Sequence, residues 1–423
     1  MTEERSRANL PALTLHVPEP RFRPGDTVDF VDVVVPPVDA ARRPDTTEKP
    51  DAFHELSYGL IRVLGEDGQA GGSWNPRLSP DMLRSMLRNM AMVRAFDERM
   101  FRAQRQGKTS FYMKSTGEEA VAVATTMALA FDDMCFPSYR QQGILIARNY
   151  SLVEMMNQIY SNRGDKLQGR QLPIMYSAKD HGFFSISGNL TTQYPQAVGW
   201  AMASAAKGDT RIAATWCGEG STAEGDFHSA CTFASVYRAP VIFNVVNNQW
   251  AISSFSGFAG AEATTFAARA IGYGIAGLRV DGNDALAVYA ATQWAAERAR
   301  TNAGPTLIEH FTYRAEGHST SDDPTQYRSA GEPTAWPLGD PVVRLRDHLI
   351  ALGEWDEERH AAMDKELAEQ VRAAQKEAET NGVLGHGMHQ PFDSMFEGVF
   401  EDMPWHLREQ QAQMRAERES AGI

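Results

Sequence analysis

The sequence has few cysteines, no long hydrophobic run and no hydrophobic leader. Its three cysteines, Cys135, Cys217 and Cys231, are odd in number and lack the spacing of metal ligands, which favours free, buried thiols in a reducing compartment. No apolar run reaches the length of a membrane span, so we expect no membrane partner. The opening residues MTEERSRANL have no apolar core and predict neither a secretory signal nor an organellar transit peptide. We therefore expect a cytoplasmic protein.

The sequence also has fewer basic than acidic residues, 41 Lys and Arg against 54 Asp and Glu. The formal net charge is −13, and a nucleic-acid partner is not expected because binding to a phosphate backbone needs a basic face. What remains is an ordinary globular composition, with 43% hydrophobic and 22% charged residues in a chain of 423. This composition and length are sufficient for a large core.

The composition divides the chain into three segments. Residues 1–74 are rich in Pro, Asp and Arg and predict an extended arm that does not fold alone. Residues 75–335 alternate strand-like and helical stretches, which predicts an α/β domain whose parallel sheet has helices on both faces. Within this domain, residues 132–140 are expected to form a loop. Residues 336–423 contain a charged amphipathic stretch at 356–380 and predict a helical C-terminal segment.

The most informative stretch lies between a Gly-Glu-Gly turn (218–220) and an Asn-Asn pair (247–248). Residues 211–216 and 241–246 have the pattern of strands buried on both faces. Residues 222–238, between them, place apolar side chains at helical spacing. In an open parallel sheet, ligands bind beyond the carboxyl ends of the strands. The acid of the turn and the second asparagine should therefore emerge side by side at one edge.

Glu219 and Asn248 offer oxygen ligands that suit magnesium beside a phosphate group. Gly218 and Gly220 let a backbone approach a diphosphate closely, and the helix expected directly after Gly220 offers free N–H groups. A carboxylate and an amide oxygen, completed by phosphate and water oxygens, make the octahedral shell that magnesium prefers. A Gly-Glu-Gly turn or an Asn-Asn loop alone is common without any ligand, but the spacing that joins the two favours a metal site.

The segment GEGSTAEGDFHSACTFASVYRAPVIFNVVNNQWAIS resembles the thiamin diphosphate signature, and its fuller pattern is similar to the alpha subunits of 2-oxo acid dehydrogenases. These subunits belong to the decarboxylating first component of multienzyme complexes. The resemblance implies the thiamin diphosphate-binding fold, with Gly218 and Gly220 at the cofactor. It also implies that Glu219 and Asn248 bind magnesium through their side chains, and Trp250 through its main-chain carbonyl. Glu219 stands where most thiamin enzymes have aspartate, and it keeps the carboxylate.

Two further segments resemble the family near its cofactor. In FPSYRQQG, the resemblance implies that Tyr139 and Arg140 contact the cofactor, although a lone arginine there would more often form a surface salt bridge. TYRAEGHSTSDDPTQYR resembles the active-site loop of the family. The resemblance implies that His318 contacts the diphosphate and transfers a proton, while Arg314 and Asp322 order the loop. Tyr139, Arg314 and His318 are the candidate catalytic residues.

A third loop, HGFFSISGNLTTQYPQA, resembles the family segment that holds the cofactor from below and sometimes binds a potassium ion. By this resemblance, Ser187 and Leu190 contact the cofactor, and the oxygens of Ser187, Thr192 and Gln193 are candidate potassium ligands. The sequence has Asn189 where relatives commonly have proline. An ordinary hydrogen-bonded loop is therefore an equal alternative to the potassium site.

One catalytic group of thiamin enzymes is missing from the sequence. The cofactor needs a carboxylate that protonates its pyrimidine ring, and two-chain members of the family carry this glutamate on a beta subunit. No second, pyrimidine-binding α/β domain is evident in the chain. The resemblance therefore implies a heterotetramer of two alpha and two beta chains that works with a lipoyl acyltransferase component.

The segments TSFYMKSTGEEA and GHSTSDDPTQYR, with the long N-terminal arm, look most like the branched-chain members of the family. We therefore expect oxidative decarboxylation of 2-oxo acids of the 3-methyl-2-oxobutanoate type, with acyl transfer to lipoyl-lysine. Pyruvate is the second choice and acetoin the third. An alternative from a different class is a non-catalytic subunit that binds a nucleotide or diphosphate through the Gly-Glu-Gly turn. The Asn-Asn pair argues against that alternative, because a nucleotide-binding fold does not need it.

Overall fold

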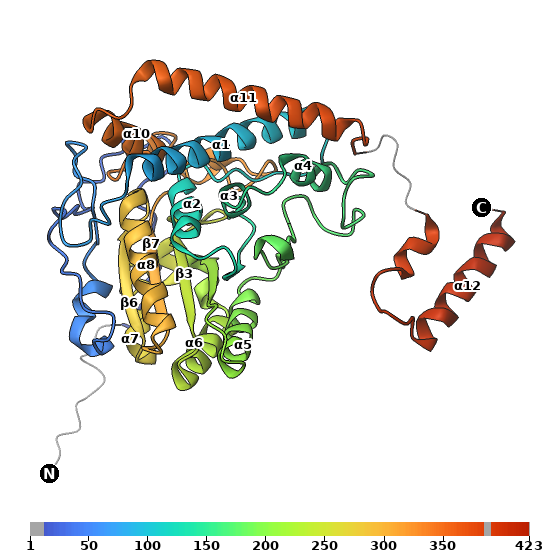
Figure 1. The fold of residues 1–423 in the computed structure, drawn as a ribbon, viewed down its shortest axis with the longest axis horizontal. Helices are drawn as coiled ribbons and strands as arrows, with labels where there is room; N and C mark the ends of the chain where they lie inside the picture. The colour runs from blue at the N-terminus through green and yellow to red at the C-terminus, as the bar shows by residue number, and fades with distance from the viewer. Residues whose placement is uncertain (1–11, 385–390, 423) are drawn as a thin grey trace, which may run out of the picture.

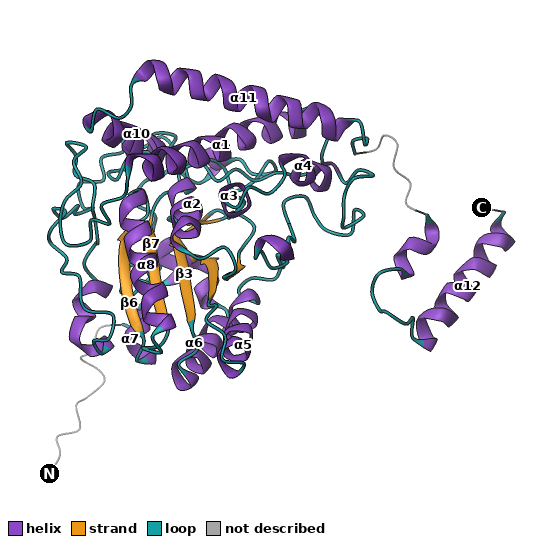
Figure 2. Cartoon of the chain, viewed as in Figure 1, coloured by secondary structure: helices purple, strands orange, loops and turns teal. Residues whose placement is uncertain are grey.

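The computed structural model describes residues 12–384 and 391–422. At its centre lies a parallel five-stranded sheet in the order β1-β2-β3-β7-β6 (Figures 1 and 2). The strands are β1 (Met134–Phe136), β2 (Ala213–Gly218), β3 (Val241–Asn247), β6 (Ala276–Asp281) and β7 (Thr306–Phe311). Because every neighbouring pair is parallel, the carboxyl ends of all five strands meet at one edge of the sheet.

Helices cover both faces of this sheet. On one face lie α2 (Glu119–Ala128) and α8 (Ala285–Arg300), and on the other lie α5 (Gln193–Ala206), α6 (Gly225–Tyr237) and α7 (Arg269–Tyr273). Neighbouring residues of a strand alternate between the two resulting cores: Ile242 packs with the α8 side and Phe243 with the α5 and α6 side. Both faces of the central strands are therefore buried, which explains their continuous apolar runs. The predicted α/β fold with helices on both faces is confirmed.

Two local predictions were wrong. Residues 132–140 do not form only a loop, because β1 pairs with β2 there. Three residues are too few to give a recognisable pattern, and Cys135 and Phe136 are buried by the fold around them. The helix expected directly after Gly220 is instead a 3-10 segment, η4 (Glu219–Ala223), and α6 begins only at Gly225. The Thr222 hydroxyl closes this segment by donating to the carbonyl of Glu219 (2.5 Å).

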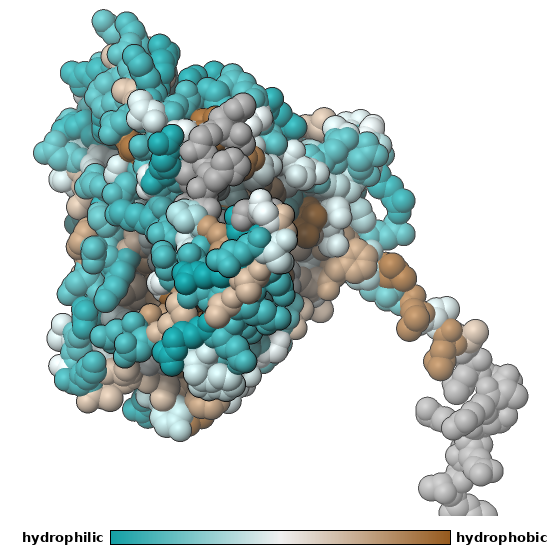
Figure 3. Space-filling model, turned by 90° about the vertical axis from the view of Figure 1, so that its right-hand side faces the viewer, coloured by the Kyte–Doolittle hydropathy of each residue, from teal (hydrophilic) through white to brown (hydrophobic). Residues whose placement is uncertain are grey.

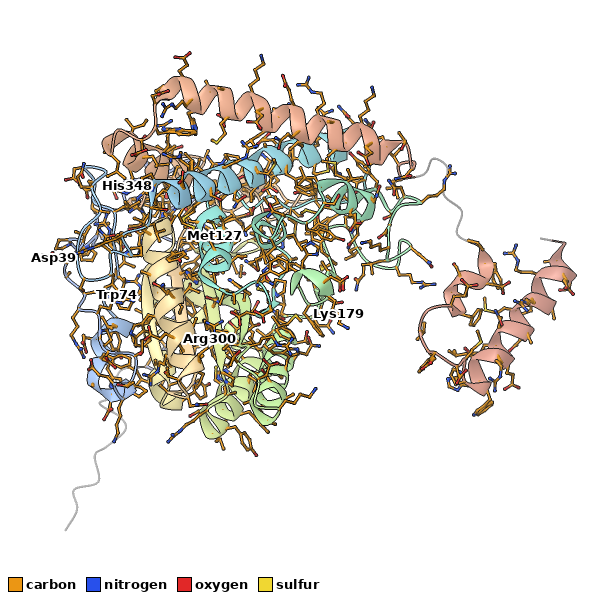
Figure 4. All side chains as sticks on the ribbon, in the orientation of Figure 1. Asp39, Trp74, Met127, Lys179, Arg300 and His348 are labelled. Atoms are coloured by element: carbon orange, nitrogen blue, oxygen red, sulfur yellow. The ribbon has the colours of Figure 1, made fainter. Side chains whose placement is uncertain are left out.

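The described part of the N-terminal arm, residues 12–74, runs along the sheet as extended chain and contains the 3-10 segment η2 (Pro50–Ser57). It is held by buried aromatic contacts: Trp74, which Figure 4 labels, packs edge-on against Trp294 of α8 with ring centroids 6.2 Å apart. Ile61 forms a parallel bridge with Val280 of β6, so the arm extends the edge of the sheet. The division of the chain at residues 74 and 335 stays a prediction.

A layer of helices lies across the top of the body in Figure 1, where α11 runs along α1. The layer comprises α1 (Pro80–Arg105), α4 (Leu152–Tyr160), α10 (Pro341–Ala351) and α11 (Glu357–Glu379). The amphipathic pattern of α11 buries Leu367 and Val371 in the main core and leaves its charged residues in solvent. The predicted helix at 356–380 is therefore confirmed.

The remaining elements are short or peripheral. They are α3 (Gly143–Ala147), η3 (Lys179–His181), β4 (Trp250–Ala251), β5 (Ser254–Phe255), η5 (Ser256–Ala259), η6 (Pro324–Gln326), α9 (Glu332–Ala335), η7 (Phe392–Phe396) and α12 (Trp405–Ala421). The segment with η7 and α12 projects from the body in Figure 1, and the Arg170 guanidinium of the body donates to the carbonyl of Ser394 in η7. The surface seen from that side is mostly hydrophilic (Figure 3). None of the described helices is long and apolar enough to cross a membrane. The three cysteines are free and buried, as predicted.

Candidate cofactor and metal site

The strand-helix-strand unit brings Glu219 and Asn248 together, although 29 positions separate them. Glu219 directly follows β2, and Asn248 directly follows β3, the neighbouring strand. The backbone N–H of Asn248 donates to Oε2 of Glu219 over 3.4 Å, and both residues are buried. The two predicted side-chain metal ligands therefore lie next to each other at the carboxyl edge of the sheet.

The surroundings of Glu219 fit a bound cation. Its Oε1 is buried and has no hydrogen-bond partner among the described residues. Burial, together with the nearby carboxylate of Glu118, raises the pKa of Glu219 to about 7. A buried carboxylate without a full set of partners is costly, and a hard cation would supply the missing partner. The described residues contain no group of three His, Cys, Asp or Glu side chains that could hold a metal, so such an ion would need amide, carbonyl and ligand oxygens as well.

A cavity of about 200 Å³ opens beside this pair. Its walls include Glu118, Tyr139, Arg140, Leu190, Gly218, Glu219, Gly220, Asn248, Trp250 and His318. Every residue predicted to bind the cofactor or the metal lies in this wall except Ser187, which lines a small adjoining crevice. The cavity therefore gathers residues from six separate stretches of the sequence.

Gly220 lies where a side chain would not fit. A Cβ atom there would be 2.5 Å from Cβ of Ala251, in strand β4 of the short hairpin after Asn248. Such a contact is far closer than van der Waals packing allows, so the glycine lets η4 and β4 approach each other. Gly218 is the last residue of β2, and open space surrounds its Cβ position.

Arg140 and His318 form another part of the cavity wall. The Arg140 guanidinium donates to the backbone carbonyl of His318 over 2.9 Å and lies 3.3 Å from Nδ1 of its ring. Burial, together with the positive charges of Arg140 and Arg314, lowers the pKa of His318 to about 3, so the imidazole is neutral at neutral pH. The Tyr139 ring meets the His318 ring edge-on, with centroids 5.9 Å apart. These three predicted residues are brought together.

Arg314 lies behind this wall and does not line the cavity. Its guanidinium donates to the carbonyls of Trp250 (2.9 Å) and Ile252 (2.8 Å) and to the hydroxyl of Tyr327 (2.7 Å). Asp322 accepts from the same hydroxyl over 2.6 Å and from the backbone N–H of His318 over 2.6 Å. Arg314 thus contacts the β4 hairpin and Asp322 contacts the His318 loop. The loop-ordering role that the resemblance implied for both residues stays a prediction. The catalytic role assigned to Arg314 stays a prediction.

Glu118 is the wall residue that the sequence analysis missed. It is buried immediately before α2, and its Oε1 accepts a hydrogen bond of 2.7 Å from the side-chain amide of Asn248. Nε of Arg140 lies 3.6 Å from the same oxygen. The only sequence signal was an acidic pair at the start of a small-residue helix, and such pairs commonly cap helices.

The third predicted loop lies next to the cavity. The Ser187 hydroxyl accepts from the backbone N–H of Asn189 over 3.1 Å, and the Thr192 hydroxyl donates to the carbonyl of Asn189 over 3.1 Å. The Gln193 amide donates to the carbonyl of Trp216 over 2.6 Å. These contacts describe a hydrogen-bonded loop. The potassium site stays a prediction.

A larger cavity of about 430 Å³ lies on the other side of Trp250, under the N-terminal arm. Its buried acid, Glu309, already accepts hydrogen bonds from the Asn247 amide (2.8 Å) and the backbone N–H of Ala267 (2.9 Å). Its walls contain neither the Gly-Glu-Gly turn nor Asn248. We therefore assign the metal and diphosphate to the smaller cavity, where a carboxylate oxygen is left without a partner.

Comparison with protein families defines the class of protein to which this fold and site belong. Residues 87–386 match the family model described as Dehydrogenase E1 component. The chain belongs to this family, whose members in general depend on thiamin diphosphate. Residues 11–51 match a second model, described as 2-oxoisovalerate dehydrogenase E1 alpha subunit N terminal. The arm and the body of the chain thus match models of related proteins.

Individual relatives carry more specific names. The chain is 60% identical over 402 residues to the 2-oxoisovalerate dehydrogenase subunit alpha of Pseudomonas aeruginosa, which covers 95% of this chain and 98% of that protein. It is 38% identical over 365 residues to the mitochondrial subunit alpha of Homo sapiens, over 86% of this chain and 80% of that protein. It is 39% identical over 357 residues to the mitochondrial subunit alpha 1 of Arabidopsis thaliana, over 83% of this chain and 73% of that protein.

Proposed function

We propose that this chain is the alpha subunit of a thiamin diphosphate-dependent dehydrogenase of branched-chain 2-oxo acids. The observation that carries the proposal is the buried Glu219 carboxylate, which lacks a partner for one oxygen and lies against Asn248 at the carboxyl edge of the sheet. The likeness to the P. aeruginosa subunit over 95% of the chain supports the substrate class. The reaction would decarboxylate the 2-oxo acid and transfer the acyl group to lipoyl-lysine of an acyltransferase component.

The residues of the cavity wall suit both a magnesium ion and the diphosphate group that it binds. The side-chain oxygens of Glu219 and Asn248 and the carbonyl of Trp250 would hold magnesium, which prefers oxygen ligands. Arg140 and His318, in the same cavity wall, would face the diphosphate. When bound, thiamin diphosphate supplies the electron sink for the carbanion that decarboxylation leaves.

His318 is suited to donating a hydrogen bond at one defined atom. A guanidinium only donates, so Nδ1 of His318, 3.3 Å from Arg140, is the acceptor nitrogen. Nε2 therefore carries the proton of the neutral ring. Arg140 also bonds the backbone carbonyl of His318, which fixes the loop and the ring together. A neutral imidazole held in this way can donate a hydrogen bond from Nε2 to an oxygen in the cavity.

We assign the carboxylate that activates the pyrimidine ring to a beta subunit. The part of the chain that the structure describes contains one parallel sheet with its helices and one two-stranded hairpin, with no second α/β domain. The proposed assembly is a heterotetramer of two alpha and two beta chains, with the cofactor between unlike subunits. The lipoyl acyltransferase is its further partner.

Steady-state rates of the chain co-expressed with its beta subunit, on a panel of 2-oxo acids, test this function. The two carbons that 3-methyl-2-oxobutanoate has beyond pyruvate add about 0.8 kcal/mol each when buried in an apolar pocket, or about fifteenfold in kcat/KM. We therefore expect a higher kcat/KM for 3-methyl-2-oxobutanoate than for pyruvate. A higher value for pyruvate, or turnover of acetoin alone, would place the chain in a different branch of the family.

A further inference from the structure

Glu118 contacts two groups of the cofactor cavity, the Asn248 amide and the Arg140 guanidinium. It is 2% exposed, and its Oε1 accepts the hydrogen bond of 2.7 Å from the Asn248 amide, although 130 positions separate the two residues. The same oxygen lies 3.6 Å from Nε of Arg140. One carboxylate thus contacts both the amide of a proposed metal ligand and the guanidinium of a proposed diphosphate ligand.

This contact determines which end of the Asn248 amide faces the neighbouring groups. An ionised carboxylate only accepts hydrogen bonds, so the NH₂ group of Asn248 must point toward Glu118. The backbone N–H of Trp250 donates to Oδ1 of Asn248 over 3.2 Å, which requires the same orientation. The amide oxygen is therefore kept away from Glu118 and remains free to accept a second partner.

The adjacent residue, Glu119, provides the structural comparison. It is equally buried, but its Oε1 accepts from Nε of Arg94 over 2.8 Å and its Oε2 from the backbone N–H of Gly117 over 2.8 Å. Glu119 contacts no other acid or amide of the cavity wall and does not line the cavity. Glu119 therefore contacts only groups near the start of α2 and Arg94, whereas Glu118 contacts residues of the cavity wall.

We propose that Glu118 is a positioning residue that orients the Asn248 amide toward magnesium and couples the metal site to Arg140. This inference rests on the proposed function. Groups that orient metal ligands in this way typically contribute about 10-fold to 100-fold to metal affinity. The role of Glu118 should therefore appear in magnesium binding more strongly than in the chemical step.

The test compares Glu118→Gln with Glu119→Gln in the complete alpha–beta assembly. Glutamine keeps the size of the side chain, but it can present either an oxygen or an NH₂ group to Asn248 and carries no charge for Arg140. We expect the magnesium concentration for half-maximal thiamin diphosphate binding, measured by calorimetry, to rise about 10-fold or more for Glu118→Gln. The loss of kcat in Glu118→Gln should be larger at limiting magnesium than at saturating magnesium. Glu119→Gln should leave magnesium binding unchanged and lower only the melting temperature.

Glu219→Gln, measured in the same way, separates two kinds of failure. If Glu219→Gln loses magnesium-dependent binding while Glu118→Gln binds like the wild type, the proposed function stands and the role of Glu118 is refuted. If Glu118→Gln behaves like Glu119→Gln, with a lower melting temperature and unchanged magnesium binding, its role is only structural and the inference fails. If Glu219→Gln also binds normally, the assignment of the whole site is wrong. A melting curve for each assembly identifies variants that do not fold, and Glu118→Asp replaces Glu118→Gln in that case.

Discussion

The backbone N–H of Asn248 donates to the Glu219 carboxylate over 3.4 Å, while the other oxygen of that carboxylate has no partner among the described residues. The first contact fixes the position of the carboxylate at the edge of the sheet. The second oxygen is held in a buried place where leaving it unpaired costs free energy. A ligand that supplied the missing partner would stabilise this arrangement, and the predictions below follow from it.

Replacing His318 with alanine should lower turnover far more than stability. Its ring is partly exposed in a polar loop and contacts Arg140 and Tyr139, so its removal leaves no cavity in the core. Loss of one positioned proton-transfer or phosphate-binding group typically costs about 10²–10⁴-fold in rate. We expect a loss of this order in kcat with a melting temperature close to that of the wild type. A large fall in melting temperature with normal activity per folded molecule would make His318 structural.

Gly220→Ala should disturb the site, whereas Gly225→Ala should not. The added Cβ at Gly220 meets Cβ of Ala251 at 2.5 Å and forces the β4 backbone to move, which typically costs about 1–3 kcal/mol. No atom lies within 4 Å of the corresponding position at Gly225, the first residue of α6. Thermal unfolding and thiamin diphosphate affinity of both variants check this. Equal behaviour of the two variants would show that η4 and β4 do not need their close approach.

Acid should destabilise the protein partly through His310. Burial lowers its pKa to about 3, whereas an unfolded histidine has a pKa of about 6.5. Between these values the unfolded chain binds a proton that the folded chain does not, so this contribution to stability is lost as the pH falls below about 6.5. Glu219, whose pKa is raised, acts in the opposite direction. The test is therefore the difference between variants: the melting temperature should fall less for His310→Gln than for the wild type between pH 7.5 and 5.5.

The chain purified without a beta subunit should not decarboxylate 2-oxo acids. The described residues supply the diphosphate and metal side of the site, and we assign the pyrimidine-activating carboxylate to the partner. Carbon dioxide release from 3-methyl-2-oxobutanoate should be at background for the chain alone and should appear when the beta subunit is added. Activity of the chain alone would refute the assignment of that carboxylate.

Much of the site could be predicted from the sequence because its main residues follow directly from strand ends. Glu219 and Asn248 each follow one of the two strands of a strand-helix-strand unit. Neighbouring parallel strands place their carboxyl ends side by side. Tyr139, Arg140 and His318 were found through their resemblance to family segments. The structure brings all five residues to one cavity wall.

The rest depends on contacts that the sequence does not encode locally. Glu118 reaches Asn248 from the start of a helix 130 positions away, and its acidic pair has no pattern that distinguishes it from a helix cap. Arg314 belongs to the matched loop, but its side chain turns toward the carbonyls of Trp250 and Ile252 and away from the cavity. The strand β1 is defined only by its pairing with β2. Such tertiary contacts become visible only when the fold is assembled.

Calorimetric titration of thiamin diphosphate into the alpha–beta assembly, with and without magnesium, tests the central claim most directly. We predict tight, magnesium-dependent binding by the wild type. Binding should weaken for Asn248→Ala, which removes a neutral ligand, and weaken more for Glu219→Ala, which removes a charged ligand. Unchanged affinity of Glu219→Ala in the presence of magnesium would contradict the account.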